Sequence, residues 1–313
     1  MVSCFGMAGR PSMVIFGAAM INQLKTIVLL GVLSALLIGI GGALGPDYVT
    51  GAVVMAAVMN LGAYFFSDRI VLAMQRAEEV PPERAPELHA IVEELSQRAG
   101  IPKPRVYVIP QAQPNAFATG RNPQHAVVAV TEGIVQLLDA RELRGVLAHE
   151  LSHVKNRDIL IASIAATVAA AVSYVAHVAG FFGVSQRDDD GPGPLQSLLL
   201  VLVAPIAATL VQLGISRSRE FEADRSGAVL SGDPEALARA LEKLEAGAHA
   251  IPAQVEPATA SLFIVNPFGG ARTVLRLFST HPSTEERVRR LRAMAVEVRG
   301  HRAGWSSGAP AGI

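Results

Sequence analysis

The chain has 313 residues, with 27 basic and 27 acidic side chains, so its formal net charge is zero. Half of the residues are hydrophobic, only 17% are charged and the mean hydropathy is +0.36, which is too apolar for a purely soluble domain and indicates membrane segments. The balanced charge gives no sign of a nucleic-acid partner, and the single cysteine, Cys4, excludes an intrachain disulfide and a cysteine-based metal site.

Residues 1–25 form an N-terminal extension that we expect to be disordered. Residues 1–19 mix glycine, proline and other small residues, and they do not form a convincing signal peptide. Met20 directly precedes the first long apolar run, which makes it an alternative to Met1 as the start of translation.

Residues 26–66 predict a transmembrane hairpin. Two uncharged stretches of about twenty residues, each long enough to cross the hydrocarbon core, are joined by the turn at Gly45-Pro46-Asp47. Lys25 and Arg69 flank the open end of the hairpin, whereas the connection holds no basic residue. The positive-inside rule therefore places both ends in the cytoplasm.

Residues 67–158 predict the first part of a soluble domain. Pro86 opens a helix that reaches Arg98 and stops at Gly100. Short β-branched stretches then predict three strands, at 105–109, 115–120 and 125–130.

The predicted strand at 115–120 could bind substrate. A strand edge can pair with an extended peptide, which makes Asn115, Ala116 and Phe117 candidate substrate-binding residues. A small sheet that only supports the following helix is an equally good interpretation of the same residues.

A second transmembrane hairpin is predicted over residues 159–215. Uncharged runs at 159–184 and 195–215 flank a polar loop that contains Arg187. Basic residues are more numerous at the open end than in this loop, so the orientation agrees with that of the first hairpin.

Residues 216–299 predict the second part of the soluble domain, followed by a disordered tail at 300–313. A helix is expected from Asp233 to about Ala246, and a capping box at 283–286 opens another. The expected fold is mainly α with a small β-sheet (α+β), in an integral membrane protein with four transmembrane helices.

The motif His149-Glu150-Leu151-Ser152-His153 carries the clearest chemistry. Residues four apart share one face of a helix, so both imidazoles can hold one tetrahedral Zn²⁺. Glu150 is then placed to reach a water on the metal rather than the metal itself. A capping box at Asp139–Glu142 gives this helix a defined start.

A third metal ligand is expected from the polar run at 218–224. Glu220 and Glu222 are two residues apart, so on a helix they point in directions about 200° apart and only one can meet the metal. Glu220 is favoured because Asp224, one turn later, shares its face. Asp224 could accept the second ring N–H of a ligand histidine and fix its tautomer.

Taken together, these motifs resemble the HtpX family of membrane zinc endopeptidases, which is related to the CAAX prenyl protease 1 group. The resemblance covers roughly residues 20–295. It rests on the pairing of HExxH with the ExxxD motif of Glu220 and Asp224. The segments 115–120, 131–133 and 279–282 add to it.

The resemblance implies a role for each matching residue. It makes His149, His153 and Glu220 the ligands of one Zn²⁺ per chain, and Glu150 the catalytic residue. It also implies a multi-pass protein of the cell inner membrane, in contact with the lipid bilayer, with a zincin-like cytoplasmic metalloprotease domain that degrades damaged or misfolded membrane proteins.

His281 and Arg219 are candidates for stabilising the oxyanion of the transition state. Each also has a simpler interpretation, as a residue at a helix start and as a surface cation respectively.

Two other functional classes remain open at this point. One is an intramembrane protease of the site-2 type, although the charged residues around the motif would be very costly in lipid. The other is a non-catalytic membrane scaffold with structural zinc, for which an intact Glu150 would be unnecessary.

Overall fold

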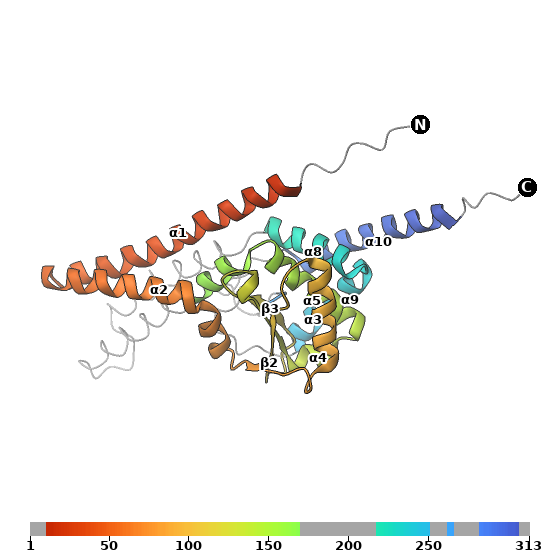
Figure 1. Cartoon of the computed structure of the whole chain (residues 1–313), viewed down its shortest axis with the longest axis horizontal. Helices are drawn as coiled ribbons and strands as arrows, with labels where there is room; N and C mark the ends of the chain where they lie inside the picture. The colour runs from red at the N-terminus through yellow and green to blue at the C-terminus, as the bar shows by residue number, and fades with distance from the viewer. Residues whose placement is uncertain (1–10, 170–216, 251–261, 266–281, 307–313) are drawn as a thin grey trace, which may run out of the picture.

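The computed structural model describes residues 11–169, 217–250, 262–265 and 282–306. In this part of the chain a pair of long helices projects from a mainly helical body that contains one small sheet (Figure 1). The expected combination of many helices with a small sheet is confirmed. The predictions for residues 170–216, including most of the second hairpin, and for His281 lie outside the described residues.

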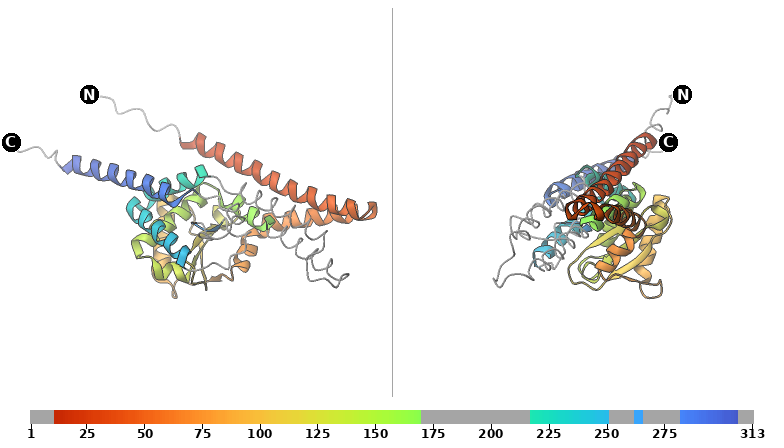
Figure 2. Two further views of the ribbon diagram at one scale, coloured as in Figure 1. Left: turned by 180° about the vertical axis from the view of Figure 1, so that it is seen from behind. Right: turned by 90° about the vertical axis from the view of Figure 1, so that its left-hand side faces the viewer.

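The projecting pair consists of α1 (Pro11–Leu44) and α2 (Val49–Met74), joined by the short 3₁₀ helix η1 (Pro46–Tyr48). The two helices lie against each other near the turn, and α1 continues past α2 toward the N-terminus in the left-hand view of Figure 2. Gly41 lets them approach, because a Cβ at this position would lie 2.5 Å from the Cβ of Ala52. Asn60 Nδ2 donates to Ser34 Oγ at 2.7 Å, and this bond links the two helices at a point farther from the turn.

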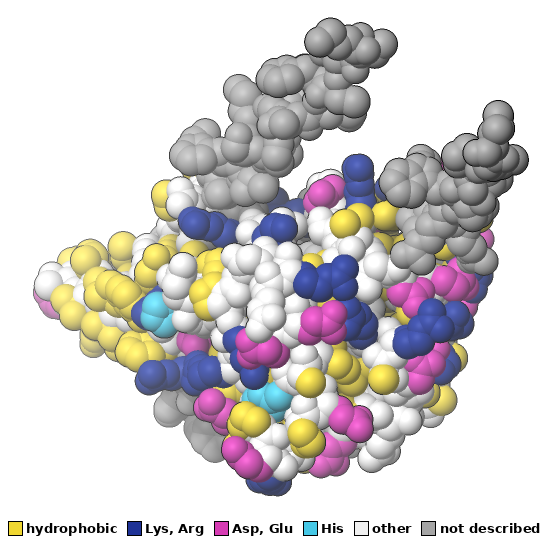
Figure 3. Space-filling model, turned by 45° about the vertical axis from the view of Figure 1, so that its right-hand side comes forward, with side chains coloured by type: hydrophobic (Ala, Val, Ile, Leu, Met, Phe, Trp, Pro, Cys, Tyr) yellow, Lys and Arg dark blue, Asp and Glu magenta, His cyan; other side chains and the backbone are white. Residues whose placement is uncertain are grey.

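The surface of this pair is apolar. Figure 3 shows hydrophobic side chains gathered over the projecting end and charged side chains spread over the body. Within the described residues, the helix Pro46–Met74 is long and apolar enough to cross a membrane. Its outward-facing residues include Val53, Val54, Met55, Val58, Leu61, Phe65 and Phe66, all of them exposed.

The sheet has the strand order β1-β2-β4-β3. Its strands are β1 (Glu78–Glu79), β2 (Arg105–Ile109), β4 (Val127–Thr131) and β3 (Ala116–Thr119). β4 pairs parallel with β2 and antiparallel with β3, so among the described residues β3 lies at an edge of the sheet. Three strands were expected; the two-residue β1 is too short to show a pattern in the sequence.

Alternate side chains of the sheet serve two separate cores. Val106, Val128 and Val130 face the main core, which contains residues of α3 (Pro86–Ala99), α5 (Ala140–Lys155) and α9 (Pro234–Ala250). Phe117 and Val127 face the other way, towards the end of α2. The period of two along each strand thus fixes α5 against one face of the sheet.

The remaining described elements complete the body, and α8 packs against α5. They are η2 (Pro123–His125), α4 (Glu132–Leu137), the helix Ile159–Ala169, α8 (Arg217–Ser231) and α10 (Thr284–Ser306). The helix Ile159–Ala169 begins where the third apolar run was expected, and it packs against Leu29 and Leu33 of α1.

The element boundaries differ from the expected ones at three places. α1 begins at Pro11, so helix replaces the disorder expected for 11–25, because apolar residues continue from Met13 into the first run. α10 likewise extends to Ser306, into the tail expected to be disordered. α9 continues to Ala250, four residues beyond its expected end at Ala246.

Candidate metal centre

α5 presents the two histidines of the motif. The capping box is confirmed: Asp139 accepts from the backbone N–H groups of Arg141 and Glu142, and the Glu142 side chain accepts from Asp139 N–H. From this start the helix runs unbroken past His149 and His153. Their Nε2 atoms lie 3.3 Å apart, so both rings point to one place.

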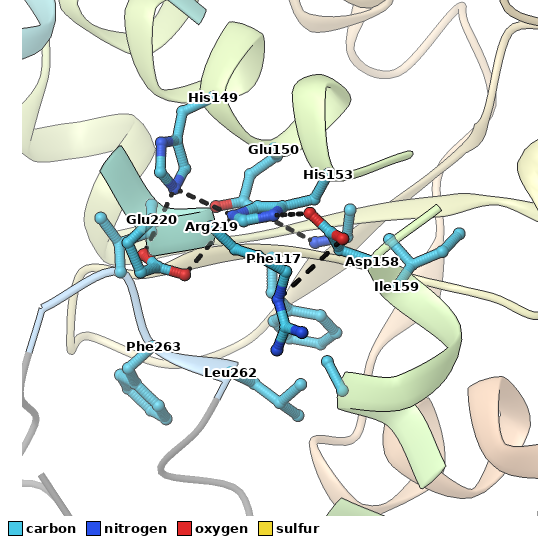
Figure 4. Close-up of a pocket in the computed structure, with 13 residues that line it drawn as sticks. Phe117, His149, Glu150, His153, Asp158, Ile159, Arg219, Glu220, Leu262 and Phe263 are labelled. Atoms are coloured by element: carbon cyan, nitrogen blue, oxygen red, sulfur yellow. Dashed lines mark hydrogen bonds and ion pairs between the residues drawn. The ribbon is translucent and has the colours of Figure 1, made fainter. Parts of the chain in front are cut away.

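α8 brings a carboxylate to the same place. Gly227 is required for this approach, because a Cβ there would lie 2.7 Å from the backbone nitrogen of His149. Two turns earlier, the Glu220 carboxylate lies 3.8 Å from His149 Nε2 and 3.6 Å from His153 Nε2 (Figure 4). Glu222 is exposed on the opposite side of α8, in agreement with the helical register expected from the sequence.

One ligand atom from each of His149, His153 and Glu220 falls within 4.8 Å of the others. Two imidazoles and a carboxylate are a ligand set used by catalytic zinc, which leaves one coordination position open. The donor atoms of these three residues therefore fit the metal that the motif predicts.

The charges around this point also fit a cation. Four carboxyl groups and two guanidinium groups surround the histidines: those of Glu150, Asp158, Glu220 and Asp224, and those of Arg219 and Arg287. Burial disfavours a charged His153, but the bond to Asp158 and the charge of Glu220 outweigh it and raise the pKa of His153 to about 9. The site thus favours positive charge where the ring nitrogens converge.

Each histidine has a carboxylate behind it. His149 Nδ1 lies 2.9 Å from Asp224 Oδ1, and His153 Nδ1 lies 3.2 Å from Asp158 Oδ2. Such partners fix the ring orientation and the tautomer of a ligand histidine. Sequence reasoning proposed Asp224 for this place but missed Asp158. The signal for Asp158 was its position just past the end of α5. In the structure, Arg157 takes a left-handed φ of 60° at this point.

Glu150 lies beside the ligand group but points to the sheet. Its Oε2 atom accepts from the backbone N–H of Ala118 in β3 at 2.9 Å. Burial raises the pKa of the Glu150 carboxyl above its ordinary value, against the opposing effect of the neighbouring histidines. A carboxyl group with a raised pKa suits a residue that takes up and returns a proton.

A pocket opens over this group. Its walls come from β3, α5, the helix Ile159–Ala169, α8 and the segment Leu262–Ile264 (Figure 4). Arg219 and Phe117 are in the lining, as the sequence suggested for residues of the site.

Asn115 and Ala116 are not in that lining. Asn115 is buried, donates from Nδ2 to Leu262 O and accepts at Oδ1 from Ile264 N–H, each at 3.2 Å. Its amide is therefore used to hold the pocket wall rather than pointed at the space where a substrate would bind.

Sequence reasoning also missed Arg287, at the start of α10. Its side chain is fully buried and donates to both oxygens of Asp224. The sequence did contain a signal for a buried Arg287. This residue falls on the face of α10 that also carries the buried Thr284, Val288 and Leu291. A cation on the buried face of a helix needs a buried partner of opposite charge.

Comparison with known proteins agrees with this geometry. The model of "Peptidase family M48" matches residues 82–295. The chain belongs to peptidase family M48. The expected resemblance to HtpX-type proteases is confirmed, and the chain is a membrane-bound metalloprotease.

Relatives of this M48 peptidase span almost its whole length. A Protease HtpX homolog from Sulfurihydrogenibium sp. (strain YO3AOP1) is 54% identical over 291 residues, covering 89% of this chain and 98% of the relative. One from Paraburkholderia phytofirmans is 52% identical over 280 residues, covering 88% and 98%. Among solved structures, that of S. mikatae Ste24p has a TM-score of 0.47 and 18% identity over 90% of this chain and 67% of its own.

Membership of the family decides between the functional classes that the sequence left open. A site-2-type intramembrane protease and a non-catalytic scaffold are not favoured. In agreement, Arg141 and Arg144 of α5 form ion pairs with Asp233 and Glu94 on the outer surface of the helical body.

Proposed function

We propose that this M48 peptidase is a zinc endopeptidase in which His149, His153 and Glu220 hold one Zn²⁺ per chain. The observation that carries the proposal is the convergence of these three side chains at one point, with Glu150 beside them. Two histidines and a glutamate, with a water in the fourth position, are a ligand set of catalytic zinc in hydrolases.

The chemistry divides between the ion and Glu150. When bound, zinc would polarise the scissile carbonyl and make a water acidic enough to give up a proton near neutral pH. Glu150 accepts that proton on its carboxylate and delivers it to the nitrogen of the leaving amine. Its bond from Ala118 N–H holds the carboxylate between the ligand group and β3.

Two further groups assist in this proposal. Asp224 Oδ1, 2.9 Å from His149 Nδ1, holds this ring with Nε2 turned toward the metal position. Arg219, a half-buried cation in the pocket lining, is placed to stabilise negative charge on the carbonyl oxygen in the transition state. His281 remains a candidate for the same role.

The substrate lies along the edge of the sheet in this proposal. β3 is an edge strand, and Phe117 and Ala118 line the pocket beside the ligand group. An extended polypeptide can pair with such an edge and pass its scissile bond over the histidines. Asn115 and Ala116 then contribute by shaping the edge, since Asn115 fixes the wall that faces it.

We further propose that the chain crosses the cell inner membrane four times and that its catalytic part faces the cytoplasm. The apolar pair α1 and α2 supports the first hairpin, and the basic residues at its open end support the orientation. A protease held at the membrane surface can reach damaged or misfolded membrane proteins, which we propose as its substrates.

The test of catalysis compares wild type with Glu150→Gln. Both purified proteins should contain about one zinc per chain, because the ligands are untouched. Casein cleavage should fall by roughly 10²–10⁴-fold in the variant, since the proton carrier is gone. Cleavage at the wild-type rate would show that Glu150 is not the catalytic residue.

The topology has a separate test. In a background with Cys4→Ser, single cysteines at Asp189 and Glu222 are labelled with a membrane-impermeant maleimide in intact cells. Asp189 should react and Glu222 should react only after lysis. The same accessibility at both positions would show that the segment 159–215 does not cross the membrane.

A further inference from the structure

Arg287 is the most deeply buried cation that the structure describes near the ligand group. It lies in the first turn of α10 with 1% of its surface exposed. Nε donates to Asp224 Oδ2 at 2.8 Å and Nη2 donates to Asp224 Oδ1 at 2.7 Å, so the two side chains form a bidentate ion pair. Burying a guanidinium group costs free energy unless its N–H groups are hydrogen-bonded, so the buried position of Arg287 depends on these acceptors.

The Asp224 carboxylate that pairs with Arg287 also lies next to the proposed ligand His149. The same Oδ1 atom that accepts from Arg287 lies 2.9 Å from His149 Nδ1. Nη1 of Arg287 also lies 4.0 Å from Glu220 Oε2. One side chain thus orients one carboxylate of the site and lies near another.

A third contact of Arg287 reaches the pocket wall. Nη1 donates to Ile264 O at 2.7 Å, while Ile264 N–H donates to Asn115 Oδ1. The segment Leu262–Val265 is therefore held on one side by α10 and on the other by the residue that precedes β3. Arg287 connects the C-terminal helix with both the ligand group and the wall of the pocket.

We propose that Arg287 is a positioning residue that sets the metal affinity of the site, by fixing Asp224 against His149 only when α10 is docked. The proposal rests on the proposed function, because it assumes that His149 binds the metal. A purely structural role for Arg287 would lower the stability of the fold and leave the zinc affinity of the folded protein unchanged. A positioning role changes that affinity.

The experiment uses the full chain in detergent and measures zinc affinity by competition with a chromophoric chelator, below the Tm of every protein compared. Arg287→Gln and Arg287→Lys are the test variants. Arg289→Gln is the matched control, because Arg289 lies on the same helix with 74% of its side chain exposed. Circular dichroism reports the fold of each.

Arg287→Gln should bind zinc about 10–100-fold more weakly, the range found when a partner of a ligand histidine is removed. Arg287→Lys should fall between it and wild type, because one ammonium group cannot span both Asp224 oxygens and Ile264 O. Arg289→Gln should match wild type.

A double variant identifies the route of the effect. If Arg287 acts through Asp224, the pair Asp224→Asn and Arg287→Gln should bind zinc no more weakly than Asp224→Asn alone. Multiplied losses in the double variant would overturn the proposal.

The remaining outcomes are equally decisive. Wild-type zinc affinity in folded Arg287→Gln would overturn the proposal and leave the proposed function standing. If Arg287→Gln does not fold, Arg287→Lys decides: a lower Tm with unchanged affinity would show a structural role only. Absence of stoichiometric zinc in the wild type would overturn the proposed function and this inference together.

Discussion

The two parts of the described structure expose opposite kinds of side chain. The hairpin of α1 and α2 turns many of its valines and phenylalanines outward and keeps a few polar groups, such as Ser34 and Asn60, between its helices. The body exposes charged side chains and buries mostly hydrophobic ones. Its centre is the exception, because α5, α8 and α10 enclose charged groups there.

The contrast shows that the surrounding solvent decides what an exposed side chain contributes to stability. An exposed valine is stabilising where it contacts lipid and close to neutral where it contacts water. The charged groups at the centre of the body are affordable because each has a partner, whereas the hairpin offers few partners to a charge.

The largest effect is expected at the centre of the body. Glu220→Ala should weaken zinc binding by more than about 100-fold, because two histidines alone hold the ion poorly. Glu222→Ala, two residues away and exposed, is the matched control and should bind zinc like wild type. Metal analysis and chelator competition on both purified proteins measure this. Loss of zinc in the Glu222 variant alone would reverse our assignment of the ligand.

A pair of exposed valines tests the contrast directly. Val58 of α2 is 61% exposed and Val229 of α8 is 68% exposed. Val58→Asp should cost roughly 2.5–3.5 kcal/mol of membrane insertion, while Val229→Asp should change stability by no more than about 0.5 kcal/mol. Membrane fractionation and thermal unfolding measure the two effects. Equal tolerance at both sites would mean that α2 does not face lipid.

Close helix contacts provide the next test. Gly227→Ala should destabilise the body by about 1–3 kcal/mol, because the new methyl group overlaps the backbone at His149. The same change should weaken zinc binding by displacing α8. Gly62→Ala in α2, where nothing lies within 4 Å, should leave the thermal midpoint unchanged or slightly raised. Unchanged stability and zinc affinity in Gly227→Ala would contradict the packing of α8 on α5.

The smallest effect is expected between the helices of the hairpin. Asn60→Leu removes the bond to Ser34 and should cost only about 0.6 kcal/mol, because polar groups in an unfolded membrane protein also find partners. Unfolding in mixed detergent, with Asn60→Gln as the conservative control, measures it. A loss of several kcal/mol would indicate that this contact holds a larger polar network.

Much of the site was predictable because its main residues obey local helical periodicity. The spacing of His149 and His153, the capping box at Asp139 and the register of Glu220 over Asp224 all depend on residues within one or two turns. What the sequence did not predict involves contacts over long distances along the chain. The amide of Asn115 bonds residues 262 and 264, and Arg287 of α10 bonds Asp224 of α8.

The element boundaries follow the same rule. The start of the motif helix carries a specific cap and was placed correctly, whereas α1 and α10 begin or end in sequences without a strong stop signal. Composition alone suggested disorder there, because small residues are common in both segments. Apolar residues from Met13 onward were the better guide for α1.

The position of Arg287 in the last described helix has a consequence for synthesis. α10 leaves the ribosome after β3, α5 and α8 have emerged. Until then Asp224 lacks the guanidinium group that pairs with it. Under the role proposed for Arg287, a nascent chain that already holds both histidines and Glu220 acquires its full metal affinity only when α10 docks.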